Sequence, residues 1–132
     1  MKIKLTNIYV DDQEKALRFY TEVLGFTKKA DFSSGPFRWL TVASPEDPGG
    51  AELQLALNDN PAAKAYQQAL FQQGQPAAMF FTDDLQADYE GMKARGAEFT
   101  RPPTDVTASK IAMLNDTCGN LIQVTQLTRW QG

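Results

Sequence analysis

The sequence of 132 residues contains no histidine and a single cysteine, Cys118. The absence of histidine excludes a Ser-His-Asp triad, a two-histidine iron site and a histidine-based zinc site. One cysteine can form neither an internal disulfide nor a cysteine-rich zinc site. Any catalysis would therefore have to use carboxylates, tyrosine, lysine, arginine or Cys118. Since Cys118 has no basic neighbour in sequence and no CxxC partner, the sequence disfavours a catalytic thiol.

The sequence also lacks a basic surplus and a long apolar run. Its 13 lysine and arginine residues are outnumbered by 16 aspartate and glutamate residues, giving a net charge of −3. This balance argues against nucleic acid and anionic lipid as partners, and favours solubility, with a cationic ligand as the alternative interpretation. No run reaches membrane-spanning length, and "MKIKLTNIYV" lacks the apolar region of a signal peptide. We therefore expect a cytoplasmic protein with no nucleic-acid or membrane partner.

What is present is a regular alternation of strand and helix patterns in a chain whose length suits one domain. Strands are predicted at residues 3–10, 26–32, 37–44, 51–58, 76–82, 109–114 and 120–127, and helices at 11–25, 59–74 and 83–96. The segment "AEFTRPP" at 97–103 is predicted to be a short edge segment, because its proline pair cannot continue a hydrogen-bond ladder.

Capping residues mark the predicted helix starts. Asp11 is the predicted N-cap of the first helix, with Glu14 three residues later in a capping-box arrangement. Asn60 can cap the second helix, with Pro61 at its first position. The "DD" pairs stand at the starts of the first and third helices, which favours capping over acid–base chemistry.

An internal repeat relates the two halves of the chain. "VDDQEKALRFY" at 10–20 aligns with "TDDLQADYEGM" at 82–92, an offset of 72 residues (83 − 11). Each half has the predicted order strand–helix–strand–strand–strand. The pattern therefore indicates two copies of one supersecondary unit.

The repeat and three motifs resemble the vicinal oxygen chelate superfamily, which includes glyoxalase I, bleomycin resistance proteins, fosfomycin-modifying enzymes and extradiol dioxygenases. The motifs are "YVDDQEKALRFYTEVLGF" at 9–26, "FFTDDLQADYEGMKARGAEF" at 80–99 and "DTCGNLIQV" at 116–124. The last resembles the family's Asp-Pro-x-Gly-Asn turn, with Thr117 in place of the proline.

The resemblance implies an α+β fold, in which two βαβββ modules form a U-shaped mixed β-sheet cup with helices on the convex face. Residues 1–132 would be a single domain, with a first half at 1–58, a linking helix at 59–75 and a second half at 76–132. It also implies a homodimer, since many relatives pair edge to edge.

Metal-dependent members of this superfamily place four ligands, usually histidine or glutamate, inside the cup. The resemblance places those positions here at Leu5, Gln54, Ala77 and Gln123. Leucine and alanine cannot ligate a metal, and two neutral amides are poor ligands without carboxylates beside them. We therefore predict no metal and no other cofactor.

Alternation of side chains along each predicted strand separates residues that face the helices from residues that line the cup. The predicted ligand-binding residues are Asn7, Tyr9, Trp39, Thr41, Glu52, Gln54, Met79, Phe81 and Gln123. Glu52 and Tyr9 are weak catalytic candidates. A carboxylate at such a position is more often a solvated charge at the rim or a salt-bridge partner, and a tyrosine hydroxyl at a strand end more often satisfies a local hydrogen bond. The phase of the strand at 109–114 stays open.

Three functions compete for this lining, which has the composition of a small-molecule pocket. The first is a metal-free protein, similar to bleomycin resistance proteins and so to antibiotic resistance, that binds or sequesters a small, partly aromatic molecule. The second is a divergent lyase, isomerase or dioxygenase-like enzyme that uses Glu52 and Tyr9 or a non-standard metal site. The third is an interaction module without a ligand. The sequence favours the first and disfavours a standard metal-dependent enzyme.

Overall fold

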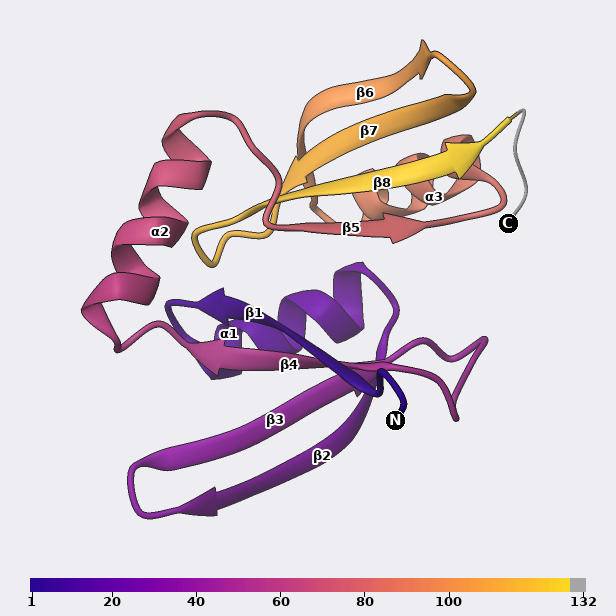
Figure 1. The fold of residues 1–132 in the computed structure, drawn as a ribbon. Helices are drawn as coiled ribbons and strands as arrows, with labels where there is room; N and C mark the ends of the chain where they lie inside the picture. Colours follow the sequence, from indigo (N-terminus) through magenta and orange to yellow (C-terminus); the bar gives the residue numbers. More distant parts are fainter. Residues whose placement is uncertain (129–132) are drawn as a thin grey trace. The chain divides into compact units, whose positions relative to one another are not determined.

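The structure is a computed structural model that describes residues 1–128. Its elements are labelled in Figure 1: β1 (Leu5–Val10), α1 (Gln13–Arg18), the π-helical turn η1 (Phe19–Val23), β2 (Thr27–Ser34), β3 (Phe37–Ala43), β4 (Glu52–Leu57), α2 (Pro61–Gln72), β5 (Ala78–Phe81), α3 (Leu85–Ala94), β6 (Glu98–Val106), β7 (Ser109–Asn115) and β8 (Leu121–Leu127). This order confirms the predicted α+β class and its two βαβββ modules. Within residues 1–128, no helix is long and apolar enough to cross a membrane.

The chain divides into two compact units, Met1–Gln67 and the segment from Gln68 onward. The boundary falls inside α2, which follows the last strand of the first unit. The predicted halves at 1–58 and 76–132, with the linker at 59–75, stay a prediction. Residues 129–132 of the predicted second half lie outside the described residues.

The first unit contains a four-stranded sheet in the order β1-β4-β3-β2. β1 runs parallel to β4, and the other neighbours are antiparallel. One face of the sheet packs against α1 (Figure 1) and is built from the buried side chains Ile8, Val10, Leu40, Val42, Leu53 and Leu55. Ala16 of α1 is also fully buried. The alternation predicted these strand residues to face the helix, together with Leu57, which is instead 39% exposed at the end of β4.

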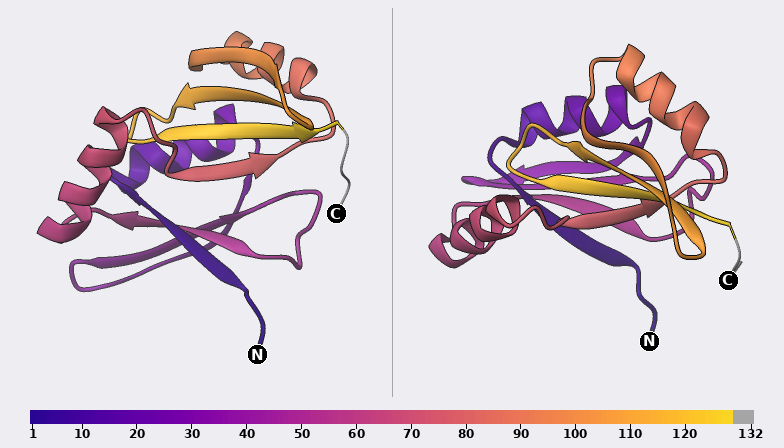
Figure 2. Two further views of the ribbon diagram at one scale, coloured as in Figure 1. Left: turned by 45° about the horizontal axis from the view of Figure 1, so that its top comes forward. Right: turned by 90° about the horizontal axis from the view of Figure 1, so that it is seen from above.

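The second unit repeats this topology in the order β5-β8-β7-β6. In both views of Figure 2, α3 lies along one face of the sheet, and it buries Leu85 and Met92. The buried strand residues of this unit include Ala112, Leu114, Ile122 and Val124. The two units therefore share one plan, a helix packed on one face of a four-stranded mixed sheet.

The starts of α1 and α3 preserve the repeat and correct one predicted cap. Asp12, and not Asp11, is the N-cap of α1, because its backbone is still extended and its carboxylate accepts the Lys15 N–H at 3.0 Å. Asp84 caps α3 in the same way, and it lies 72 residues after Asp12 (84 − 12). Asp11 instead forms an exposed ion pair with Lys15 at 3.3 Å.

A π-helical turn interrupts the helix that the sequence predicted as continuous. The Leu24 N–H donates to the Phe19 carbonyl five residues earlier, at 3.2 Å. The wider turn lets the successive residues Phe19 and Tyr20 both be buried, with their rings edge to face at 5.5 Å. A regular helical stripe predicts burial of Tyr20 but not of Phe19.

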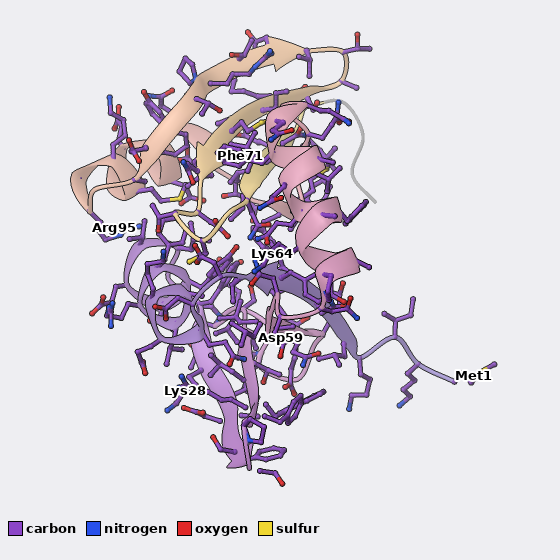
Figure 3. All side chains as sticks on the ribbon, turned by 90° about the vertical axis from the view of Figure 1, so that its left-hand side faces the viewer. Met1, Lys28, Asp59, Lys64, Phe71 and Arg95 are labelled. Atoms are coloured by element: carbon purple, nitrogen blue, oxygen red, sulfur yellow. The ribbon has the colours of Figure 1, made fainter. Side chains whose placement is uncertain are left out.

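Several predicted strand limits differ from the observed ones, and β1 and β6 show the physical reasons. β1 begins at Leu5, where it first pairs with β4, and the preceding residues extend away from the sheet to the exposed Met1 (Figure 3). β6 is an edge strand as predicted but is not short, because it runs for nine residues through the proline pair. Register shifts on both sides of Arg101 leave the prolines outside the ladder, which an edge strand tolerates.

The turn between β7 and β8 is organised by the buried carboxylate of Asp116. It accepts the backbone N–H groups of Cys118 at 2.7 Å and of Asn120 at 3.0 Å, and the Asn120 side-chain amide at 2.7 Å. Thr117 has a left-handed backbone with φ 62°, and its N–H donates to the Asn115 side chain at 2.8 Å. Cys118 is fully buried, as expected of a structural residue. A proline could not adopt the conformation of Thr117.

An ion pair on the helix-covered face links α1 to the β2–β3 hairpin. The Arg38 guanidinium donates two hydrogen bonds of 2.9 Å to Asp31 and also lies 3.5 Å from Glu14 of α1. The bonds from Arg38 lower the pKa of Asp31 to about 2. Arg38 therefore lies on the helix side of β3, as its phase predicted.

Replacing Thr117 by proline is expected to destabilise the protein by more than about 1 kcal/mol, because proline forbids the observed φ and removes the N–H donor. Thr117→Gly, which permits this φ, is the control and should change the stability by less. Urea unfolding followed by circular dichroism measures both. A proline variant as stable as the parent protein would contradict the observed turn.

Asp31→Asn is expected to lower the free energy of unfolding at pH 7 by about 0.5–1 kcal/mol. Because folding depresses the pKa, ionised Asp31 stabilises the fold above its ordinary value of 3.8, and this contribution is lost as the pH falls through about 2. Urea titrations between pH 7 and pH 2 should therefore show the two proteins converging in acid. Asp11→Asn, in an exposed pair, is the control, and a pH-independent difference for Asp31→Asn would exclude the ion pair as its cause.

Candidate functional site

The candidate site is the side of each sheet that faces away from the helix packed on it, which we call the outer face. In the first unit, the register places Asn7, Gln54 and Thr41 side by side on this face, because Gln54 pairs with both of the others. In the second unit, Met79 and Met113 both pair with Gln123. The structure thus brings predicted site residues of each unit together on one face of its own sheet.

The distribution over the strands is as follows: Asn7 and Tyr9 lie on β1, Trp39 and Thr41 on β3, Glu52 and Gln54 on β4, Met79 and Phe81 on β5, and Gln123 on β8. The open question of the strand at 109–114 is resolved by burial. Ala112 and Leu114 are fully buried, and Ile111 and Met113 pair with Thr125 and Gln123 on the outer face.

An aromatic cluster dominates the outer face of the β2–β3 hairpin. Phe32 pairs with Trp39 across the hairpin, and their rings stack at 6.4 Å with 24° between planes. The ring of Phe37 lies 6.5 Å from that of Trp39, with 41° between their planes. Phe32 is 61% exposed and Phe37 is 53% exposed, so the cluster is not enclosed in the core. Large exposed apolar groups of this kind commonly mark binding surfaces.

Sequence reasoning missed Phe32 as a site residue, although a signal was present. The hairpin has a two-residue loop, Gly35–Pro36, between the paired residues Ser34 and Phe37. Gly35 has φ 59°, which the first central position of a type II′ turn requires. Counting back from this loop places Phe32 opposite Trp39.

Gln13 of α1 holds the strand that carries Trp39. The register between β3 and β4 ends at the pair Thr41–Gln54, and beyond it the hairpin diverges from β4 (Figure 1). The Gln13 side-chain amide donates to the carbonyl of Arg38 at 3.1 Å and to that of Leu55 at 2.9 Å. It therefore joins the two strands where their own hydrogen bonds end.

Thr41 and Glu52 form a hydrogen-bonded pair on the same face. The fully buried Thr41 hydroxyl donates to a carboxylate oxygen of half-buried Glu52 at 2.7 Å and accepts the Ala30 N–H at 3.1 Å. Leu5 and Ala43 are the strand partners of Glu52 on either side. Glu52 belongs to none of the ion pairs among residues 1–128.

Tyr9 lies at the far end of the ladder from Glu52. Leu5 pairs with Glu52 and Tyr9 pairs with Ala56, so four residues separate Tyr9 from the level of Glu52. That is roughly 13 Å between their backbones. The two predicted catalytic candidates therefore do not form one acid–base pair. The Tyr9 carbonyl accepts the amide of buried Gln67 at 2.9 Å, which fixes this end of β1.

The outer face of the second unit carries exposed apolar side chains and the side-chain amide of Gln123. Met79 is 48% exposed and Phe81 is 62% exposed. The Gln123 amide donates to the Thr125 hydroxyl at 3.1 Å, two residues further along β8. Gln123 therefore lies on the side of β8 that the alternation predicted.

The predicted metal-ligand positions hold two apolar side chains, Leu5 and Ala77, and the amides of Gln54 and Gln123. Among residues 1–128, no group of three or more histidine, cysteine, aspartate or glutamate side chains could hold a metal ion. The residues at these positions do not fit the ion of metal-dependent relatives. That the protein carries no metal stays a prediction.

Comparison with known proteins identifies the fold's relatives. The sequence pattern of the Glyoxalase/Bleomycin resistance protein/Dioxygenase superfamily matches residues 2–124. The uncharacterized protein YurT of Bacillus subtilis (strain 168) is 52% identical over 126 residues, which cover 96% of this chain and 99% of YurT.

Two solved structures have the same fold over almost their whole length. UcmS2 has a TM-score of 0.82 at 25% identity, with 95% of this chain and 97% of UcmS2 covered. TnmS3, an antibiotic binding protein from Streptomyces sp. CB03234, has a TM-score of 0.73 at 32% identity, with 96% of each chain covered. Sequence match, duplicated topology and structural likeness agree, and the protein belongs to the Glyoxalase/Bleomycin resistance protein/Dioxygenase superfamily.

Proposed function

We propose that the protein binds and sequesters a small, partly aromatic molecule on the outer face of the sheet in its first unit. The observation that carries this proposal is the exposed aromatic cluster of Phe32, Phe37 and Trp39. Stacked rings offer a planar ligand a large contact area at a low cost in side-chain entropy. The similarity to TnmS3, an antibiotic binding protein, favours an antibiotic-like ligand.

The side chains around the cluster support recognition by hydrogen bonds. Asn7, Gln54 and Thr41 form a polar row on the face that carries Trp39. The second unit, taken by itself, presents Met79, Phe81 and Gln123 on its own outer face, where exposed apolar surface is combined with an amide. An apolar lining with a few polar groups is typical of small-molecule sites. The proposal includes a cytoplasmic homodimer without metal or other cofactor.

A second candidate function, a divergent enzyme, is favoured by one observation, the Glu52 carboxylate held by Thr41 on the outer face. Tyr9 is too far from Glu52 along the ladder to serve as its proton-donating partner. Sequestration explains the same face without a reaction. Liquid chromatography with mass spectrometry of a bound compound after incubation distinguishes the two, because only the enzyme would give a product that differs from the compound in mass or, for an isomerase, in retention time.

Trp39→Ala is expected to abolish most binding of an aromatic antibiotic, because it removes the central ring of the cluster. Anthracycline, naphthoquinone and bithiazole antibiotics form the test panel. A ligand that binds the native state raises the free energy of unfolding, by about 2.7 kcal/mol at 100 times its Kd, and so raises the melting temperature. Trp39→Ala should lose this shift.

Tyr66→Ala is the matched control, because Tyr66 is also an exposed aromatic of the first unit but lies on α2. Its variant should retain the shift of the parent protein. Equal shifts in the parent protein and in Trp39→Ala, or no shift with any member of the panel, would count against the proposed function. Elemental analysis of the purified protein checks the prediction that no divalent metal is bound.

A further inference from the structure

Glu52 differs from three carboxylates of the first unit that form ion pairs on the sheet or on α1. Asp31 pairs with Arg38, Asp11 with Lys15, and Glu14 with Arg38. Glu52 receives one hydrogen bond, from the neutral Thr41 hydroxyl, and forms no ion pair within residues 1–128. A carboxylate without a cation partner can accept a charge-assisted hydrogen bond from a cationic ligand.

The surroundings fix the orientation of this carboxylate. The Thr41 hydroxyl accepts the Ala30 N–H, so its own proton points to the carboxylate. The bond uses one oxygen of Glu52, and an ionised carboxylate can accept about four hydrogen bonds in all. The side chains of its strand partners, Leu5 and Ala43, carry no hydrogen-bond donor. The remaining capacity of Glu52 is therefore available to a donor on a ligand.

The aromatic cluster lies within reach of the same ligand. Trp39 is two residues from Thr41 on β3 and on the same face, roughly 6.6 Å along the strand. Glu52 itself pairs with Ala43, four residues from Trp39, but its carboxylate reaches back to the Thr41 hydroxyl at 2.7 Å. A short chain on a ring stacked against Trp39 would therefore extend along the strand toward the Thr41–Glu52 pair. Lys28 of β2 pairs with Asp31, and none of the ion pairs among residues 1–128 includes Glu52.

We propose that Trp39 and Glu52 together select a ligand in which a planar aromatic ring is joined by a short chain to a protonated amine. This rests on the proposed function and names the ligand class of the same outer face. The ring stacks on the cluster, and the ammonium group donates to the oriented carboxylate in a charge-assisted hydrogen bond. Gln54, beside Thr41 in the polar row, adds a neutral partner for the chain.

Three probes that differ in one group test the charge preference: tryptamine, its neutral analogue tryptophol, and the anion indole-3-acetate. Isothermal titration calorimetry at pH 7 measures the affinity of each. Tryptamine should bind at least about tenfold more tightly than tryptophol, and indole-3-acetate most weakly, because hydrogen bonds to charged groups are stronger than neutral ones. Tryptamine binding should weaken as the salt concentration rises.

Glu52→Gln keeps an acceptor for the Thr41 hydroxyl and removes the charge. It should lower the affinity for tryptamine about tenfold, to that of tryptophol, and leave tryptophol binding unchanged. Glu46→Gln, which removes a charge from the exposed β3–β4 loop, should leave all three affinities unchanged. Trp39→Ala should weaken all three probes together. Circular dichroism and the melting temperature verify that each variant is folded.

The outcomes separate this inference from the proposed function. If tryptamine and tryptophol bind equally and Trp39→Ala weakens both, the preference for a cation is overturned while aromatic binding stands. If Glu52→Gln lowers the affinity for all probes equally, the charge is likewise not the determinant. If none of the probes binds, the inference is overturned, and the antibiotic panel decides separately whether the proposed function stands.

Discussion

Burial of one face of each sheet against a helix is the constraint on which the rest of the structure depends. Ile8, Val10 and Leu55 are in contact with the core of the first unit, so their strand neighbours must point to the opposite side. A register slip of one residue would expose this apolar set and bury the polar row of Asn7 and Gln54. The outer face therefore follows from hydrophobic burial on the other side of the same strands.

Duplication of the unit explains the common plan, and side-chain replacement explains the different surfaces. Asp12 and Asp84 cap equivalent helices with equivalent hydrogen bonds, because an N-cap depends on local geometry alone. The outer faces have diverged: the first carries a stacked aromatic cluster beside a carboxylate, whereas the second carries Met79 and Phe81 around the Gln123 amide. The same backbone thus presents two chemically different surfaces.

Local and periodic signals predicted most of the fold, and the errors arose where a backbone exception decided the outcome. The capping side chain is Asp12 instead of its neighbour Asp11, because two adjacent aspartates offer equal signals and only the helix start distinguishes them. The π-helical turn buries Phe19, a position that the regular helical period of 3.6 residues would leave outside the buried stripe. β6 continues through its proline pair because the prolines, which lack a backbone N–H, lie at register shifts of an edge strand, where no neighbouring strand requires that hydrogen bond.

Alternation, the paired aspartates at the helix starts and the 72-residue offset (83 − 11) by themselves determined the class of fold, the strand faces of Trp39, Glu52 and Gln123, and the family resemblance. Each of these depends on spacing along the chain. Tertiary structure alone decided that Phe32 stacks on Trp39, that Gln13 joins β3 to β4, and that Thr41 orients Glu52. These contacts join residues on different elements, and the distance between such residues is set by strand register and helix packing, which no single stretch of sequence encodes.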